Sequence, residues 1–257
     1  MEYDSRYARL IWYNIFMGCL HLAQAVVIYL ISNDFTLPIT TSFVQYIPDT
    51  GKLEPVTDTI INLPLGPMIA LFFLLSAFAH FTVSFPGIFG WYKNNLKRGI
   101  NYARWYEYSF SASLMIVLIA MLCGLYDLAA LLMAFALIAV MNLCGLIMEV
   151  HNQTTEKTNW LSFWVGCLAL IVPWAAIAIY FFGSLSTAEG SIPTFVYIIL
   201  PTLFVFFSCF ALNMVLQYKR VGPWRDYLFG EKVYILLSLV AKSALAWQVF
   251  AGTLRPV

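Results

Sequence analysis

The chain has 257 residues, of which 61% are hydrophobic and 11% are charged, and its mean hydropathy is +0.80. Soluble domains carry about 25% charged residues, so this composition excludes an ordinary soluble protein and indicates a chain that crosses a membrane several times. The formal net charge of +1 identifies no partner, and no nucleic-acid ligand is expected.

Seven apolar stretches have the length of about 20 residues that a helix needs to cross the hydrocarbon core of a bilayer. They lie near residues 10–31, 67–91, 103–125, 128–150, 160–182, 194–217 and 233–251. Apart from residues 32–66, the connections between them are short. The sequence therefore predicts an all-α membrane protein in which residues 1–257 form a single seven-helix domain.

The first stretch also has features of a secretory signal peptide, because Arg6 and Arg9 precede the apolar run and Ala23-Gln-Ala25 imitates a cleavage box. The apolar run continues unbroken to Ile31. We therefore prefer an uncleaved first membrane helix.

The segment 32–66 follows the first helix and is the one long connection. Residues Ser42 to Ile47 are rich in β-formers, Pro48 to Gly51 favour a turn, and polar positions alternate from Leu53 to Ile61. This pattern predicts a β-hairpin outside the cell, and a disordered loop is the alternative.

The orientation follows from the distribution of Lys and Arg, which are enriched in short cytoplasmic loops. With the N-terminus in the cytoplasm, the outer side receives only Lys52 and Arg255. The inner side then receives eleven basic residues: Arg6, Arg9, Lys93, Lys97, Arg98, Arg104, Lys157, Lys219, Arg220, Arg225 and Lys232. We expect a multi-pass protein of the cell membrane with a cytoplasmic N-terminus and an extracellular C-terminus.

Lys242 is the first candidate for function, since it is the only lysine within an apolar membrane segment. A buried ammonium costs several kcal/mol unless it is paired, solvated or chemically used. Glu107, just inside the third stretch, is its expected partner, because the other twelve acids are assigned to loops or helix ends that water can reach. Arg104 and Ser111 lie on the same helical face as Glu107. The pair is either a structural link between two helices or a Schiff-base cation with its counterion.

These residues resemble a known family. Arg104-x-x-Glu107, the adjacent Tyr108, a proline in the sixth stretch and Lys242 in the seventh are similar to the microbial rhodopsins. The inverted orientation, the single acid and the long segment after the first helix make the whole chain resemble the heliorhodopsins. The resemblance implies that all-trans retinal is bound to Lys242 as a protonated Schiff base with Glu107 as counterion.

The resemblance assigns further residues to the retinal site. Tyr108 would cover one face of the polyene, while Tyr197 and Phe204, which flank Pro201 in the sequence, match aromatic positions that enclose the chromophore. The wider family usually has tryptophan at these two positions, so ordinary core packing is the alternative. Ser238 stands where pumps carry a second acid, and Ser111 joins the candidate site.

His21, Gln24 and His80 resemble the polar cluster that heliorhodopsins hold on the cytoplasmic side of the chromophore, and Arg104 is grouped with them. This cluster could hold the Schiff-base proton during the photocycle, since the pKa of imidazole lies near neutrality. Hydrogen-bonded core histidines are the alternative.

The function expected from these features is a light-sensing photoreceptor that signals to an unidentified cytoplasmic partner. Leu118 stands where proton pumps carry a donor carboxylate, so the relay needed for pumping is missing. A light-gated or light-driven ion transporter remains the alternative, and a passive channel would need no relay. We expect no enzyme and no metal, because the loops lack catalytic and zinc-ligand spacings. The resemblance also implies a homodimer that packs through the hairpin.

Overall fold

The computed structural model describes residues 2–187 and 194–254. Its α-helices are α1 Glu2–Ile31, α2 Leu65–Ser84, α3 Pro86–Lys97, α4 Tyr102–Leu122, α5 Leu128–His151, α6 Leu161–Thr187, α7 Thr194–Tyr218 and α8 Tyr227–Val249. Two strands, β1 Thr36–Ile47 and β2 Lys52–Pro64, follow α1, and two short helical turns, η1 Gly222–Arg225 and η2 Phe250–Leu254, flank α8.

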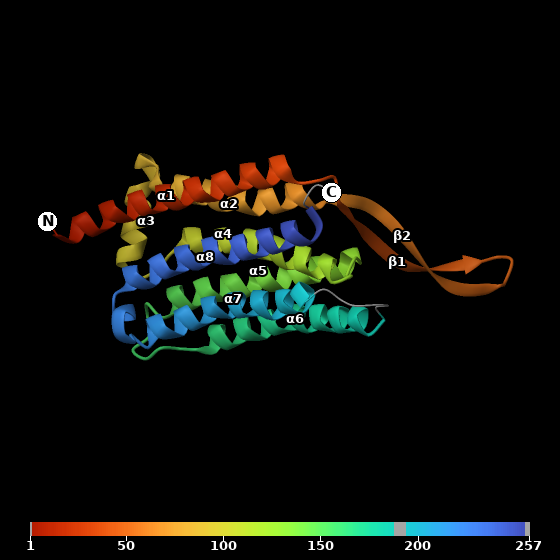
Figure 1. The fold of residues 1–257 in the computed structure, drawn as a ribbon. Coiled ribbons are helices and arrows are strands. Elements are labelled where there is room, and N and C mark those ends of the chain that lie inside the picture. The colour runs from red at the N-terminus through yellow and green to blue at the C-terminus, as the bar shows by residue number, and fades with distance from the viewer. Residues whose placement is uncertain (1, 188–193, 255–257) are drawn as a thin grey trace.

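Within the described residues, seven helices are long and apolar enough to cross a membrane, namely all except α3. They lie side by side in an elongated bundle (Figure 1). The predicted seven-helix membrane fold is therefore confirmed.

The second apolar stretch is not one continuous helix, which corrects the helix expected over 67–91. Phe85 is extended, with φ −67° and ψ 135°, because the ring of Pro86 disfavours a helical conformation in the preceding residue. Helix α2 therefore ends at Ser84, and α3 runs across the end of the bundle (Figure 1). We call this the α3 end.

The predicted hairpin is confirmed. Strands β1 and β2 pair antiparallel up to Ile47 and Lys52, and Gly51 completes the turn with φ 65°, a conformation that favours glycine. The hairpin projects beyond the other end of the bundle, the hairpin end (Figure 1). Its base is held to the bundle by the amide of Thr40, which donates to the carbonyl oxygen of Tyr126 over 2.9 Å.

Helix α4 is the most buried of the seven spanning helices. Asn101 caps its first turn by accepting a hydrogen bond from the Arg104 amide. Because α4 packs against α2 and α5, the polar residues in its first two turns face other helices. Glu107 lies in this part of α4.

Candidate functional site

The site is centred on Lys242, which is only 3% exposed. Its Nζ lies 3.5 Å from Oε1 of Glu107 and donates a hydrogen bond to Oγ of Ser238 over 2.9 Å. Ser238 precedes Lys242 by one helical turn, so α8 supplies both groups on one face. The expected pairing of Lys242 with Glu107 is present in the structure.

Ser76 of α2 is a further member of this site, and the sequence did not reveal it. Its Oγ donates to Oε1 of Glu107 over 2.6 Å, so the carboxylate has partners on two neighbouring helices. In the sequence, Ser76 could have been recognised from its position one helical turn before His80, which places both side chains on one face of α2.

An apolar pocket begins at Lys242 and passes between α4, α5, α6, α7 and α8. The space between its walls is about 800 Å³, counted to its open mouth. Its larger lining side chains are Trp105, Tyr108, Met115, Met141, Phe163, Phe207, Phe210 and Met214. We call this the lysine pocket.

Two aromatic residues of α4 shape the wall beside the lysine. The Tyr108 ring centroid lies 5.4 Å from Nζ of Lys242, and the Tyr108 hydroxyl donates to the Tyr234 carbonyl over 2.8 Å. Trp105 packs so closely on Gly145 that a Cβ there would lie 2.4 Å from the indole ring. A residue without a side chain at 145 therefore lets the Trp105 ring form part of the pocket wall.

The structure corrects the expectation for Tyr197 and Phe204. Both line a separate surface groove between α6 and α7 and are 49% and 42% exposed. Phe207 and Phe210, the next aromatic residues on the inner face of α7, line the lysine pocket instead.

His21 and His80 lie together, as the sequence predicted. Their rings stack with centroids 5.5 Å apart, and Nδ1 of His80 is 2.8 Å from Oδ1 of Asn14. His80 and Asn14 also line a small polar cavity that reaches Glu107 and Ser238.

The other predicted members of this cluster are placed differently. Gln24 is half-buried and accepts a hydrogen bond from the Trp247 indole, and it does not line the polar cavity. Ser111 is fully buried, and its hydroxyl has no hydrogen-bond partner within the described part of the chain.

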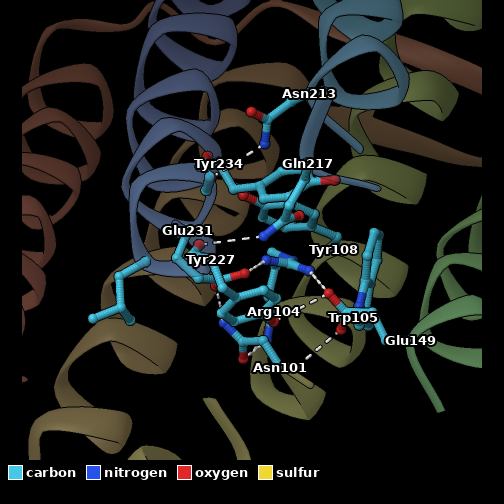
Figure 2. A network of polar contacts seen from close by, with 12 residues as sticks. Asn101, Arg104, Trp105, Tyr108, Glu149, Asn213, Gln217, Tyr227, Glu231 and Tyr234 are labelled. Atoms are coloured by element: carbon cyan, nitrogen blue, oxygen red, sulfur yellow. Dashed lines mark hydrogen bonds and ion pairs between the residues drawn. The ribbon is translucent and has the colours of Figure 1, made fainter. Parts of the chain in front are cut away.

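Arg104 lines the polar cavity, but its guanidinium belongs to a second network (Figure 2). It forms ion pairs with Glu231 and, over 2.5 Å, with Glu149. Both acids also accept hydrogen bonds, from the Asn101 amide side chain and from the Trp105 indole respectively. We call these residues the arginine network.

This arrangement corrects the expectation that Glu107 is the only acid shielded from water. Glu149 and Glu231 are 1% and 0% exposed, although they lie near the ends of α5 and α8. Their positions near helix ends suggested contact with water, but Asn101 donates hydrogen bonds to both acids and the Tyr227 hydroxyl donates to Glu149.

Comparison with solved structures gives a match to a light-driven proton pump from Leptosphaeria maculans, with a TM-score of 0.62 over 94% of this chain and 93% of that one. At 12% identity this likeness shows the fold alone. No curated protein sequence matches the chain. The family model for heliorhodopsins matches residues 10–254, nearly the whole length. The chain therefore belongs to the heliorhodopsin family, a family of retinal-binding membrane proteins.

Proposed function

We propose that this protein is a light sensor that binds all-trans retinal at Lys242, with Glu107 as the counterion, and that it does not pump ions. The observation that carries the proposal is the buried Lys242–Glu107 pair at the inner end of the lysine pocket. A structural ion pair alone would not need an apolar pocket that starts at the amine and crosses five helices.

The lysine pocket fits retinal in its chemistry. Pockets for small cofactors have mostly apolar walls with a few polar groups. Here the walls are aromatic side chains, methionines and two glycines, Gly145 and Gly166, and the amine of Lys242 is the reactive group.

Retinal would supply light absorption and isomerisation, and its linkage to Lys242 would keep the positive charge in place. The residues of the chain do the rest. Glu107 balances that charge, and Ser76 and Ser238 orient the two partners through their hydroxyl groups. Tyr108 limits movement on one side of the lysine. The His21–His80 stack is positioned to hold a proton near the polar cavity.

The distribution of buried acids supports sensing over pumping. Apart from Glu107, the buried carboxylates in the described residues are Glu149 and Glu231, and both are neutralised in part by Arg104 at the α3 end. A pump also needs a group on the opposite side of the lysine to release or accept the proton. Among the described residues, no buried acid lies between Lys242 and the hairpin end.

We propose that the α3 end faces the cytoplasm and the hairpin end faces outward. The starts of α1 and α8, helix α3 and the α5–α6 and α7–α8 connections carry the basic residues, whereas Lys52 lies in the hairpin. Exposed apolar residues on the hairpin, including Val44, Tyr46 and Leu53, support packing against a second copy of the chain.

Purification of protein made with added all-trans retinal tests the proposal. The wild type should be coloured, and Lys242→Ala should be colourless because the attachment point is lost. Lys232→Ala, ten residues earlier on the same helix and exposed, is the matched control and should stay coloured. A Lys242→Ala protein that kept the wild-type visible band would overturn the assignment.

A further inference from the structure

A wide crevice opens at the α3 end, outside the site described above. Its walls come from α1, α3, the connection between α5 and α6, and the connection between α7 and α8. The space between these walls is about 1,450 Å³, counted to its open mouth. Because segments from across the bundle end surround it, the crevice lies over the middle of the bundle and away from its lipid-facing sides.

The crevice is strongly basic. Its described lining includes Arg6, Lys97, Arg98, Arg220 and Arg225. The acids in the lining are Glu156 and Asp226, which leaves a surplus of three positive charges. Asp226 is already paired with Arg6. Within the described residues, no acidic side chain forms an ion pair with Arg98, Arg220 or Arg225.

Arg220 has a backbone conformation that is unfavourable for arginine. Its φ is 52°, in the left-handed region that favours glycine, and it lies two residues after the last residue of α7. The Arg220 amide donates to the Gln217 carbonyl and the Val221 amide to the Leu216 carbonyl, which is a helix-ending motif that usually has glycine at this position. The chain thus carries a guanidinium in the crevice wall where a glycine would form the turn with less strain.

Gln217 adds an unpaired polar group to the crevice wall. It is 8% exposed and lines the crevice, and its Oε1 has no hydrogen-bond partner in the part of the chain that the structure describes. Its Nε2 donates to the Tyr227 carbonyl. An acceptor left unpaired in a buried position costs free energy, and this oxygen is closed to solvent, so a ligand hydroxyl or amino group would complete it only after the Gln217 side chain turned toward the crevice.

We infer that this crevice binds a soluble ligand that carries two or more phosphate groups. Guanidinium groups match the geometry of phosphate oxygens and bind them through paired hydrogen bonds. Arg98, Arg220 and Arg225 would contact the phosphates. A concave space enclosed by several segments suits a compact ligand better than an extended acidic peptide.

Titration calorimetry on the dark protein in nanodiscs of neutral phosphatidylcholine tests the inference, with sodium tripolyphosphate and ATP as probes. Both should bind with saturation, and Arg220→Gly should weaken binding by about tenfold or more, since it removes charge-assisted hydrogen bonds. Glycine is the residue that the turn prefers, so this variant should melt at or above the wild-type temperature. Lys219→Gln, an exposed neighbour outside the crevice, is the control for loss of one charge and should bind as wild type does.

Four results would overturn the inference. If neither probe bound with saturation, the crevice would not be a ligand site. If Arg220→Gly and Lys219→Gln weakened binding of the probes equally, the probes would be attracted only by the overall positive charge. Stronger binding of hexaglutamate than of tripolyphosphate would assign the crevice to an acidic protein segment. If only phosphatidylinositol bisphosphate placed in the nanodisc bound, the phosphate would come from a lipid and the soluble ligand would be excluded. Binding of the probes in the dark does not require retinal. A negative result in this binding test therefore leaves the proposed light-sensing function untouched.

Discussion

Glu107 is the residue on which the charge balance of the site depends. Its carboxylate contacts Lys242 on α8 and Ser76 on α2, and Ser238 occupies the position from which a second acid could share the charge. Opposite charges in a poorly hydrated site stabilise each other strongly, and loss of one leaves the other buried without compensation.

Glu107→Gln should therefore give a pigment that loses its proton near neutral pH and absorbs further to the blue than wild type. Titration of the visible band in chloride-free buffer measures this change, since chloride could replace the missing charge. Glu156→Gln, at an exposed loop position, is the matched control and should titrate as wild type does. An unchanged titration of Glu107→Gln would mean that another group balances the charge.

His21 and His80 should affect the time course of the light reaction without affecting retinal binding. They stack on each other, and His80 lines the cavity that reaches Glu107, so the pair is positioned to gain a proton after illumination. His21→Gln and His80→Gln keep hydrogen-bonding groups but cannot titrate near neutrality. Flash photolysis should show altered lifetimes or yields in both variants and in the double variant.

His151→Gln, at the exposed end of α5, provides the control for the histidine variants and should follow wild-type kinetics. If the double variant of His21 and His80 also matched wild type, the two histidines would have only a structural role.

Among the helices, α4, α5 and α8 are joined at the α3 end by the arginine network. One positive group, Arg104, lies between the carboxyl groups of α5 and α8, so the buried network has two acids for one guanidinium (Figure 2). The Tyr227 hydroxyl and the Trp105 indole add hydrogen bonds to Glu149. Such a network holds the three helices in register, but only while its charges are paired.

This charge count predicts an order of stability among variants of the arginine network. Arg104→Gln leaves two buried carboxylates unpaired and should cost about 3 to 5 kcal/mol in the free energy of unfolding. Glu231→Gln leaves one balanced pair, Arg104 with Glu149, and should cost clearly less. Thermal melting of the purified pigment measures the order, with the exposed Arg9→Gln as control. Equal losses for Arg104→Gln and Glu231→Gln would contradict this account.

For the whole molecule, the polar groups are distributed unequally along the bundle. The arginine network, the polar cavity and the basic crevice all lie from Lys242 toward the α3 end. The hairpin end lacks buried acids among the described residues. That residues 1–257 form one domain, and that two copies pair through the hairpin, stay predictions.

The unequal distribution of buried acids along the bundle predicts that light does not drive net proton transport. Suspended cells that contain the coloured protein should show no pH change on illumination that an uncoupler abolishes, because no acid chain continues past Lys242. Cells with a light-driven proton pump serve as the positive control. A sustained, uncoupler-sensitive pH change would favour the transporter over the sensor.

The sequence by itself determined the membrane class, the seven helices, the hairpin and the pairing of Lys242 with Glu107. Each of these depends on local properties: the length of apolar runs, the alternation of β-formers around a turn, and the high cost of an isolated charge in a helix. The family resemblance also followed from residues at fixed spacing, and the family match bears it out.

Only the tertiary structure decided which acids are buried and which aromatic residues enclose the pocket. Glu149 and Glu231 lie near helix ends, and their burial depends on segments distant in sequence that cover them. Helix α7 is apolar on all sides, so its sequence does not show which face is turned inward, and Phe207 and Phe210 line the pocket in place of Tyr197 and Phe204. Ser76 likewise reaches Glu107 because α2 packs against α4, a contact between helices that no local pattern encodes.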